Sequence, residues 1–78
     1  MPLKELIHTI AVELVDQKDQ VQVTEVSGEH NSVIELRVAK EDIGKVIGKE
    51  GRTAQSMRTL LTAVSQKLGR RAHLDIVD

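Results

Sequence analysis

The sequence predicts an α+β domain in which three helices cover one face of a three-stranded mixed sheet. The spacing of apolar residues changes along the chain from the period of a helix to that of strands. It then returns to the period of helices and ends with that of a strand. The order is helix, strand, strand, helix, helix, strand. The chain has 78 residues, which gives room for one core between two layers and none for a second. We therefore expect residues 1–78 to form a single domain.

The first element is an amphipathic helix. Its apolar positions follow the i, i+3, i+4, i+7 spacing of one helix face. They are Leu3, Leu6, Ile7, Ile10, Ala11 and Leu14. Acidic residues occur at intervals along this segment, and it contains no long apolar run. We therefore expect neither a secretory signal nor a membrane span. This favours a soluble protein of the cytoplasm.

Two strands are expected next, as an antiparallel hairpin. Residues 21–26 alternate apolar and polar side chains, and the alternation is clearer at Ile34, Leu36 and Val38. Residues 27–32 between them are polar and include a glycine and an asparagine, which both adopt positive φ readily. The sequence therefore predicts that this segment is the hairpin loop.

The second half of the chain predicts two helices joined by a tight turn. Ile43, Val46 and Ile47 indicate a helix of about two turns that ends at Gly48. A longer helix is expected from Gly51 or Arg52 to residue 68. Its apolar stripe would consist of Ala54, Met57, Leu61, Val64 and Leu68, with Gly69 as the stop signal.

The last element is a strand in which Ala72, Leu74 and Ile76 alternate with polar residues. Because it returns through two helices, we expect it to pair parallel to a neighbour, which makes the sheet mixed.

Charge is unevenly distributed, although the net value is only −1. Residues 1–36 hold two basic and seven acidic side chains, whereas residues 37–78 hold nine basic and five acidic ones. The positive charge is concentrated in residues 44–58, which contain Lys45, Lys49, Arg52 and Arg58 against Glu50. An anion-binding surface is expected there.

The same region contains "GKVIGKEG" at residues 44–51. A Walker A loop is excluded, because only three residues separate Gly44 from Gly48 and Lys49 precedes a glutamate where a magnesium-binding Ser or Thr is needed. A dinucleotide fingerprint is excluded because the chain contains no Gly-x-Gly. Gly44 is expected to ease the close packing of a helix or the approach of a strand.

What remains is a Gly-x-x-Gly turn at residues 48–51. Two glycines lack Cβ atoms where the chain reverses, so a phosphate could approach the backbone amides and the N-terminus of the next helix. Lys49 and Arg52 would flank that phosphate, and Ile43, Val46 and Ile47 would form the wall of a groove for bases.

The stretch "VIGKEGR" at residues 46–52 resembles the Val-Ile-Gly-x-x-Gly motif of the K-homology (KH) family of RNA-binding domains. The element order resembles the type II topology of that family, α-β-β-α-α-β, and the resemblance covers essentially the whole chain. It implies a backbone clamp for about four nucleotides of single-stranded RNA. Glu50 departs from this picture, because it weakens the positive field of the loop. The predicted RNA-binding set is Ile43, Lys45, Val46, Ile47, Gly48, Lys49, Glu50, Gly51 and Arg52.

The resemblance also implies partners and a process. Such proteins self-associate and pair with a larger KH-containing protein, and they act as RNA chaperones or post-transcriptional regulators in cell elongation or envelope control. An alternative is a dimerisation module in which RNA binding is secondary. A DNA-binding helix-turn-helix is less favoured, because the apolar stripe of the last helix is needed for the core.

Nothing in the sequence favours catalysis. The chain has no cysteine, and its three histidines lack metal-ligand spacing and stand at no recognisable distance from a nucleophilic serine. We expect no enzyme activity, no cofactor and no metal. The absence of Phe, Tyr and Trp also excludes base stacking on aromatic rings, so RNA binding is expected to be weak and salt-sensitive.

Overall fold

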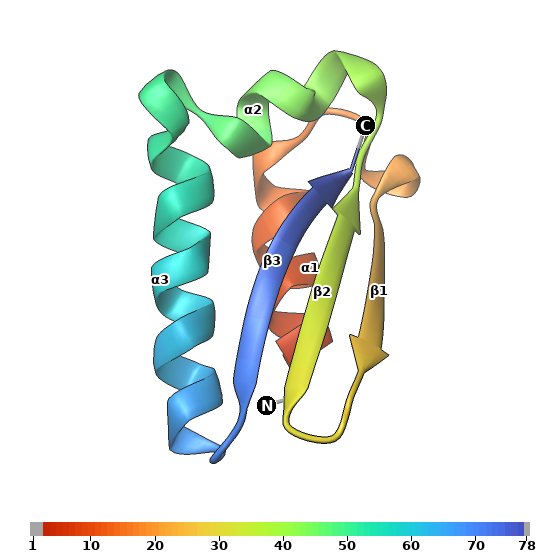
Figure 1. Cartoon of the computed structure of the whole chain (residues 1–78). Helices are drawn as coiled ribbons and strands as arrows, with labels where there is room; N and C mark the ends of the chain where they lie inside the picture. Colours follow the sequence, from red (N-terminus) through yellow and green to blue (C-terminus); the bar gives the residue numbers. More distant parts are fainter. Residues whose placement is uncertain (1–2, 78) are drawn as a thin grey trace.

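A computed structural model describes residues 3–77. Three helices and three strands follow one another in the predicted order (Figure 1). They are α1 (Leu3–Leu14), β1 (Gln22–Ser27), β2 (Asn31–Arg37), α2 (Ile43–Ile47), α3 (Arg52–Lys67) and β3 (Arg71–Val77). Short 3-10 turns precede β1, α2 and α3. Within the described residues, no helix is long and apolar enough to span a bilayer.

The sheet is mixed, as predicted, with the order β1-β2-β3. β1 pairs antiparallel with β2, which places Val23 opposite Leu36. β3 pairs parallel with β2, which places Leu74 opposite Ile34. This parallel pairing requires the long crossover that α2 and α3 supply. The arrangement is a type II KH fold, and the prediction of that fold class is confirmed.

The core lies between the helices and one face of the sheet. Figure 1 shows α1 behind the strands and α3 beside β3, with α2 across one end of the sheet. The side chains that fill this layer alternate with exposed residues along β2 and β3, so the opposite sheet face is uncovered. The largest fully buried apolar side chains are Leu3, Ile7, Ile34, Leu36, Val46, Met57 and Leu61.

The predicted apolar stripe of α3 is wrong at its last position. Leu68 is 47% exposed, because the helix ends at Lys67 and Leu68 already belongs to the C-terminal cap. Ser65 is buried in the last turn instead, with its hydroxyl donating to the Thr62 carbonyl at 3.0 Å. Gly69 follows with a φ of 72°, as expected of a helix stop.

Candidate nucleic-acid interface

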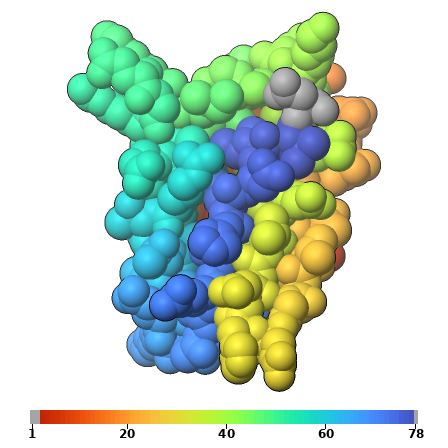
Figure 2. Space-filling view, in the orientation of Figure 1, coloured from red at the N-terminus to blue at the C-terminus, as the bar shows by residue number. Residues whose placement is uncertain are grey.

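The Gly-x-x-Gly loop (residues 48–51) joins α2 to α3 at one end of the molecule. In the space-filling view, the green-to-teal segment that contains it stands out from the body (Figure 2). The Gly51 N–H donates to the Gly48 carbonyl at 3.1 Å and closes the turn. Lys49 and Glu50 at its tip are exposed. The loop is therefore an accessible and regularly hydrogen-bonded turn.

Gly48 is required by packing inside the protein. Its φ of 79° and ψ of 172° suit glycine, and its N–H donates to the Gly44 carbonyl at 2.9 Å to end α2. A Cβ at this position would lie 2.2 Å from the Thr53 hydroxyl oxygen and 2.9 Å from the Thr53 backbone nitrogen. A side chain here would therefore collide with the first turn of α3.

Gly51 differs from Gly48 because the space around it is open. It has a left-handed backbone with φ of 74°, and a Cβ at this position would meet no atom within 4 Å. No side chain caps the N-terminus of α3 at this point. A phosphate could thus approach from the Gly51 side. Gly44 also has open space around its Cβ position, so the expectation that it eases close packing is wrong.

Glu50 adopts a left-handed conformation, with φ of 57° and ψ of 25°. Such backbone is unusual for a residue with a Cβ. Its carboxylate oxygen Oε2 lies 3.2 Å from Arg52 Nη2, and both side chains are largely exposed. Glu50 therefore competes directly with any phosphate for the Arg52 guanidinium.

Lys45 is already paired on both sides. Its Nζ lies 3.4 Å from Asp42 Oδ1 and 3.4 Å from Asp16 Oδ2. Asp42 is only 1% exposed, and its other oxygen accepts the Gln17 N–H at 3.0 Å. Lys45 thus helps to anchor α2 to the connection between α1 and β1.

These contacts set the ionisation of both groups. The Gln17 N–H, helped by Lys45, holds the pKa of Asp42 below its usual value against the opposing effect of burial. Asp42, followed by Asp16, raises the pKa of Lys45. Both groups therefore stay charged at neutral pH.

The three apolar residues predicted for the groove wall are placed differently from one another. Val46 is completely buried and belongs to the core. Ile43 is partly buried against that core, whereas Ile47 is 39% exposed. The apolar surface beside the loop therefore comes chiefly from Ile47, and Val46 supports it from below.

The positive charge near the loop continues along α3. Among the described residues, Lys49 and Arg58 take part in no ion pair. The 16 residues of α3 contain no acidic side chain. Next to the loop, a hollow on α3 is lined by Arg52, Gln55, Ser56, Thr59 and Leu60. The sequence signal for this surface was the missing acidic residues, but Gln55, Ser56 and Thr59 were not in the predicted set.

No metal centre is indicated. Between residues 3 and 77, no group of three or more His, Asp or Glu side chains is placed to hold a metal ion. The loop and the adjoining part of α3 carry Lys49, Arg52 and Arg58 against one carboxylate, that of Glu50.

A family model described as "KhpA/KhpB, KH domain" matches residues 4–76. Similar proteins include the RNA-binding protein KhpA of Aquifex aeolicus, which is 53% identical over 76 residues, 97% of this chain and 96% of the relative. The RNA-binding protein KhpA of Clostridium acetobutylicum is 49% identical over 75 residues, 96% of this chain and all of the relative.

A solved structure is similar in fold. It is that of Aquifex aeolicus Era Y63A bound to GDP.AlF4-, with a TM-score of 0.64 and 20% sequence identity. The match covers 97% of this chain and 31% of the Era chain. At this identity the similarity concerns the fold of the matched part.

Proposed function

Because the chain belongs to the KhpA/KhpB family of KH domains, we propose that it is a non-enzymatic RNA-binding protein that clamps single-stranded RNA at residues 48–51. The observation that carries this proposal is the open space at Gly51, next to the uncapped N-terminus of α3 and the exposed Lys49. Helix N-termini attract phosphate because their amide N–H groups point outward and the helix dipole is positive there.

The roles of the predicted residues can be divided by their contacts. Gly51 gives the phosphate access to the backbone, and Lys49 and Arg52 supply charge. Gly48 keeps the turn compatible with Thr53. Ile43 and Ile47 offer aliphatic surface to the bases, while Val46 and Lys45 hold α2 in place beneath them.

The test is RNA binding by the double variant K49D/E50D, measured by fluorescence anisotropy with a pool of short single-stranded RNAs. It removes a cation and adds an anion at the loop, and aspartate tolerates the left-handed backbone of Glu50. We expect affinity to fall by about tenfold or more. Unchanged affinity in a double variant with a native circular dichroism spectrum would contradict the proposal.

The single variant E50Q changes the charge of the loop in the opposite direction from K49D/E50D. It releases Arg52 from the Glu50 carboxylate, so RNA should bind about two- to fivefold more tightly, the range expected for one exposed ion pair. If the loop neutralises two phosphates, the logarithm of affinity should fall against the logarithm of salt concentration with a slope of about −1.4.

We also propose a cytoplasmic setting in which residues 1–78 act as one KH domain, as a homodimer and with a larger KhpB-like partner. Support comes from a family model that covers KhpA and KhpB together. The process would be RNA chaperoning or post-transcriptional control in cell elongation or envelope regulation. Sedimentation with and without RNA separates this proposal from the alternative, a dimerisation module. A dimer that forms without RNA and never binds it would favour the alternative.

A further inference from the structure

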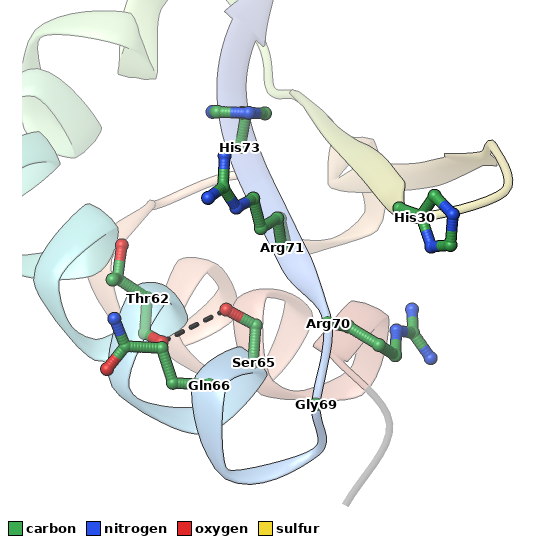
Figure 3. Close-up of a pocket in the computed structure, with 9 residues that line it drawn as sticks. His30, Thr62, Ser65, Gln66, Gly69, Arg70, Arg71 and His73 are labelled. Carbon is green, nitrogen blue, oxygen red and sulfur yellow. Dashed lines mark hydrogen bonds between the residues drawn. The ribbon is translucent and has the colours of Figure 1, made fainter.

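A second basic site lies at the other end of α3. A cavity of about 640 Å³ opens there between the last turns of α3, the start of β3 and the β1–β2 hairpin (Figure 3). Thr62 and Gln66 follow the start of α3 at Arg52 by 10 and 14 residues, so at 1.5 Å per residue the cavity lies about 15–21 Å along the helix from the Gly-x-x-Gly loop. The polar side chains around it include His30, Thr62, Gln66, Arg70, Arg71 and His73.

Hydrogen-bonding side chains from separate elements line this cavity. Arg71 and His73 are two residues apart on β3 and project from the same, uncovered sheet face, where both are exposed. Figure 3 shows the Arg71 guanidinium close to the His73 ring, with Thr62 and Gln66 across from them on α3. The Arg71 N–H donates to the His30 carbonyl at 3.3 Å, which ties the hairpin to β3.

Arg70 has a structural role at the rim. Its Nη2 lies 2.6 Å from Glu25 Oε2 and 3.2 Å from Ser32 Oγ. Glu25 is thereby neutralised. The other charged residues of the hairpin, β3 and α3 are Glu29, Glu35, Arg37, Arg52, Arg58, Lys67 and Asp75. Asp75 pairs with Glu35 in the sheet register and lies on the same sheet face as Arg71 and His73, next to His73 and four residues from Arg71.

A polar surface connects this cavity to the loop. Gln55 and Thr59 line both the hollow beside the loop and a second hollow farther along α3. Thr62 and Gln66 line both that second hollow and the cavity. The connection consists of amides, hydroxyls and the Arg58 guanidinium, without a carboxylate on α3. A polyanion can follow it without meeting a like charge from this helix.

We propose that Arg71 and His73 on β3, with Thr62 and Gln66 on α3, form a second phosphate-binding site for RNA, which holds the distal part of a strand clamped at residues 48–51. This inference rests on the proposed function. The Arg71 guanidinium supplies charge, and the His73 ring and the Thr62 and Gln66 side chains supply further hydrogen-bonding groups.

The experiment compares an RNA of about four nucleotides, the length that the loop alone accommodates, with one of about twelve nucleotides, which can reach both sites. Affinities are measured under one set of buffer conditions for the wild type, H73Q and R71Q. H8Q is the matched control, because His8 is an exposed histidine on α1.

For the wild type, the longer RNA should bind about three- to tenfold more tightly than the short RNA, the range expected for one exposed ion pair with added hydrogen bonds. R71Q and H73Q should each reduce this gain without weakening the short RNA, and H8Q should behave as the wild type.

Two results would overturn the second site alone: no gain of the longer RNA over the short RNA in the wild type, or a full gain in both R71Q and H73Q, with short-RNA binding intact and sensitive to K49D/E50D. Failure of the wild type to bind the short RNA would instead overturn the proposed function, and the second site with it.

Discussion

At the scale of single residues, the two glycines of the Gly-x-x-Gly loop serve different physical needs. Gly48 must be glycine because Thr53 occupies the space of its Cβ, whereas Gly51 leaves open space beside the N-terminus of α3. The sequence motif predicts both as openings for phosphate. Only the folded structure separates them, because the collision depends on how α3 folds back against the end of α2.

Alanine substitutions test this distinction. G48A should lower the free energy of unfolding by about 3 kcal/mol, from backbone strain and the collision with Thr53. G51A should cost about 1–2 kcal/mol, from the left-handed backbone alone. G44A should stabilise by about 0.5–1 kcal/mol, since Gly44 is helical and has open space at its Cβ position. Urea denaturation measures all three, and an equal cost for G48A and G51A would contradict the account.

Asp42 provides a pH-dependent test. Its pKa is lowered in the folded state, so its contribution to stability is present above the unfolded value of about 3.9 and is lost as pH falls through the folded value. D42N should reduce the free energy of unfolding at pH 7, with the difference from the wild type shrinking as pH falls below the unfolded value of about 3.9. D19N, at an exposed aspartate, is the control and should change neither quantity. Equal stability of D42N and wild type at pH 7 would refute this role.

The sequence could not assign this role to Asp42. Its backbone partner, Gln17, is 25 positions away, and no local pattern predicts so distant a hydrogen bond. The same applies to Lys45, which looks like a phosphate contact beside the loop but pairs with Asp16 across the fold. Distant partners of charged side chains are decided by tertiary packing.

At the scale of elements, α3 shows how much periodicity predicts. Ala54, Met57 and Leu61 are buried as the helical spacing requires. The prediction that Leu68 is buried is wrong, because the helical spacing of apolar residues continues in the sequence after the helix has ended. The five-residue helix α2 is too short to be stable by itself, so its existence depends on Val46 in the core and on the Asp42 contacts.

Adjacent leucines on α3 give a matched pair for this point. Leu61 is 1% exposed and Leu60 is 50% exposed. L61A should lower the free energy of unfolding by about 2–5 kcal/mol, because it leaves a cavity in the core. L60A should cost less than about 1 kcal/mol. Both are measured by thermal or urea unfolding, and similar costs would mean that α3 turns a different face to the core.

At the scale of the whole molecule, the order of elements and the mixed sheet followed from the alternating periods of the sequence. Parallel pairing of β3 with β2 was predictable because the two helices between them form a crossover. The cavity at the far end of α3 was not predictable. It gathers residues 30, 62 and 73 from a hairpin, a helix and a strand, and only the packed fold brings these together.

The location of RNA on the molecule is the central claim. The most direct measurement is a titration of the isotope-labelled protein with a single-stranded RNA of about four nucleotides, followed through the backbone amide NMR signals. The account predicts the largest chemical-shift changes at Ile47, Gly48, Lys49, Gly51 and Arg52. Changes confined to the uncovered face of β1 and β2, with these amides unmoved, would contradict it.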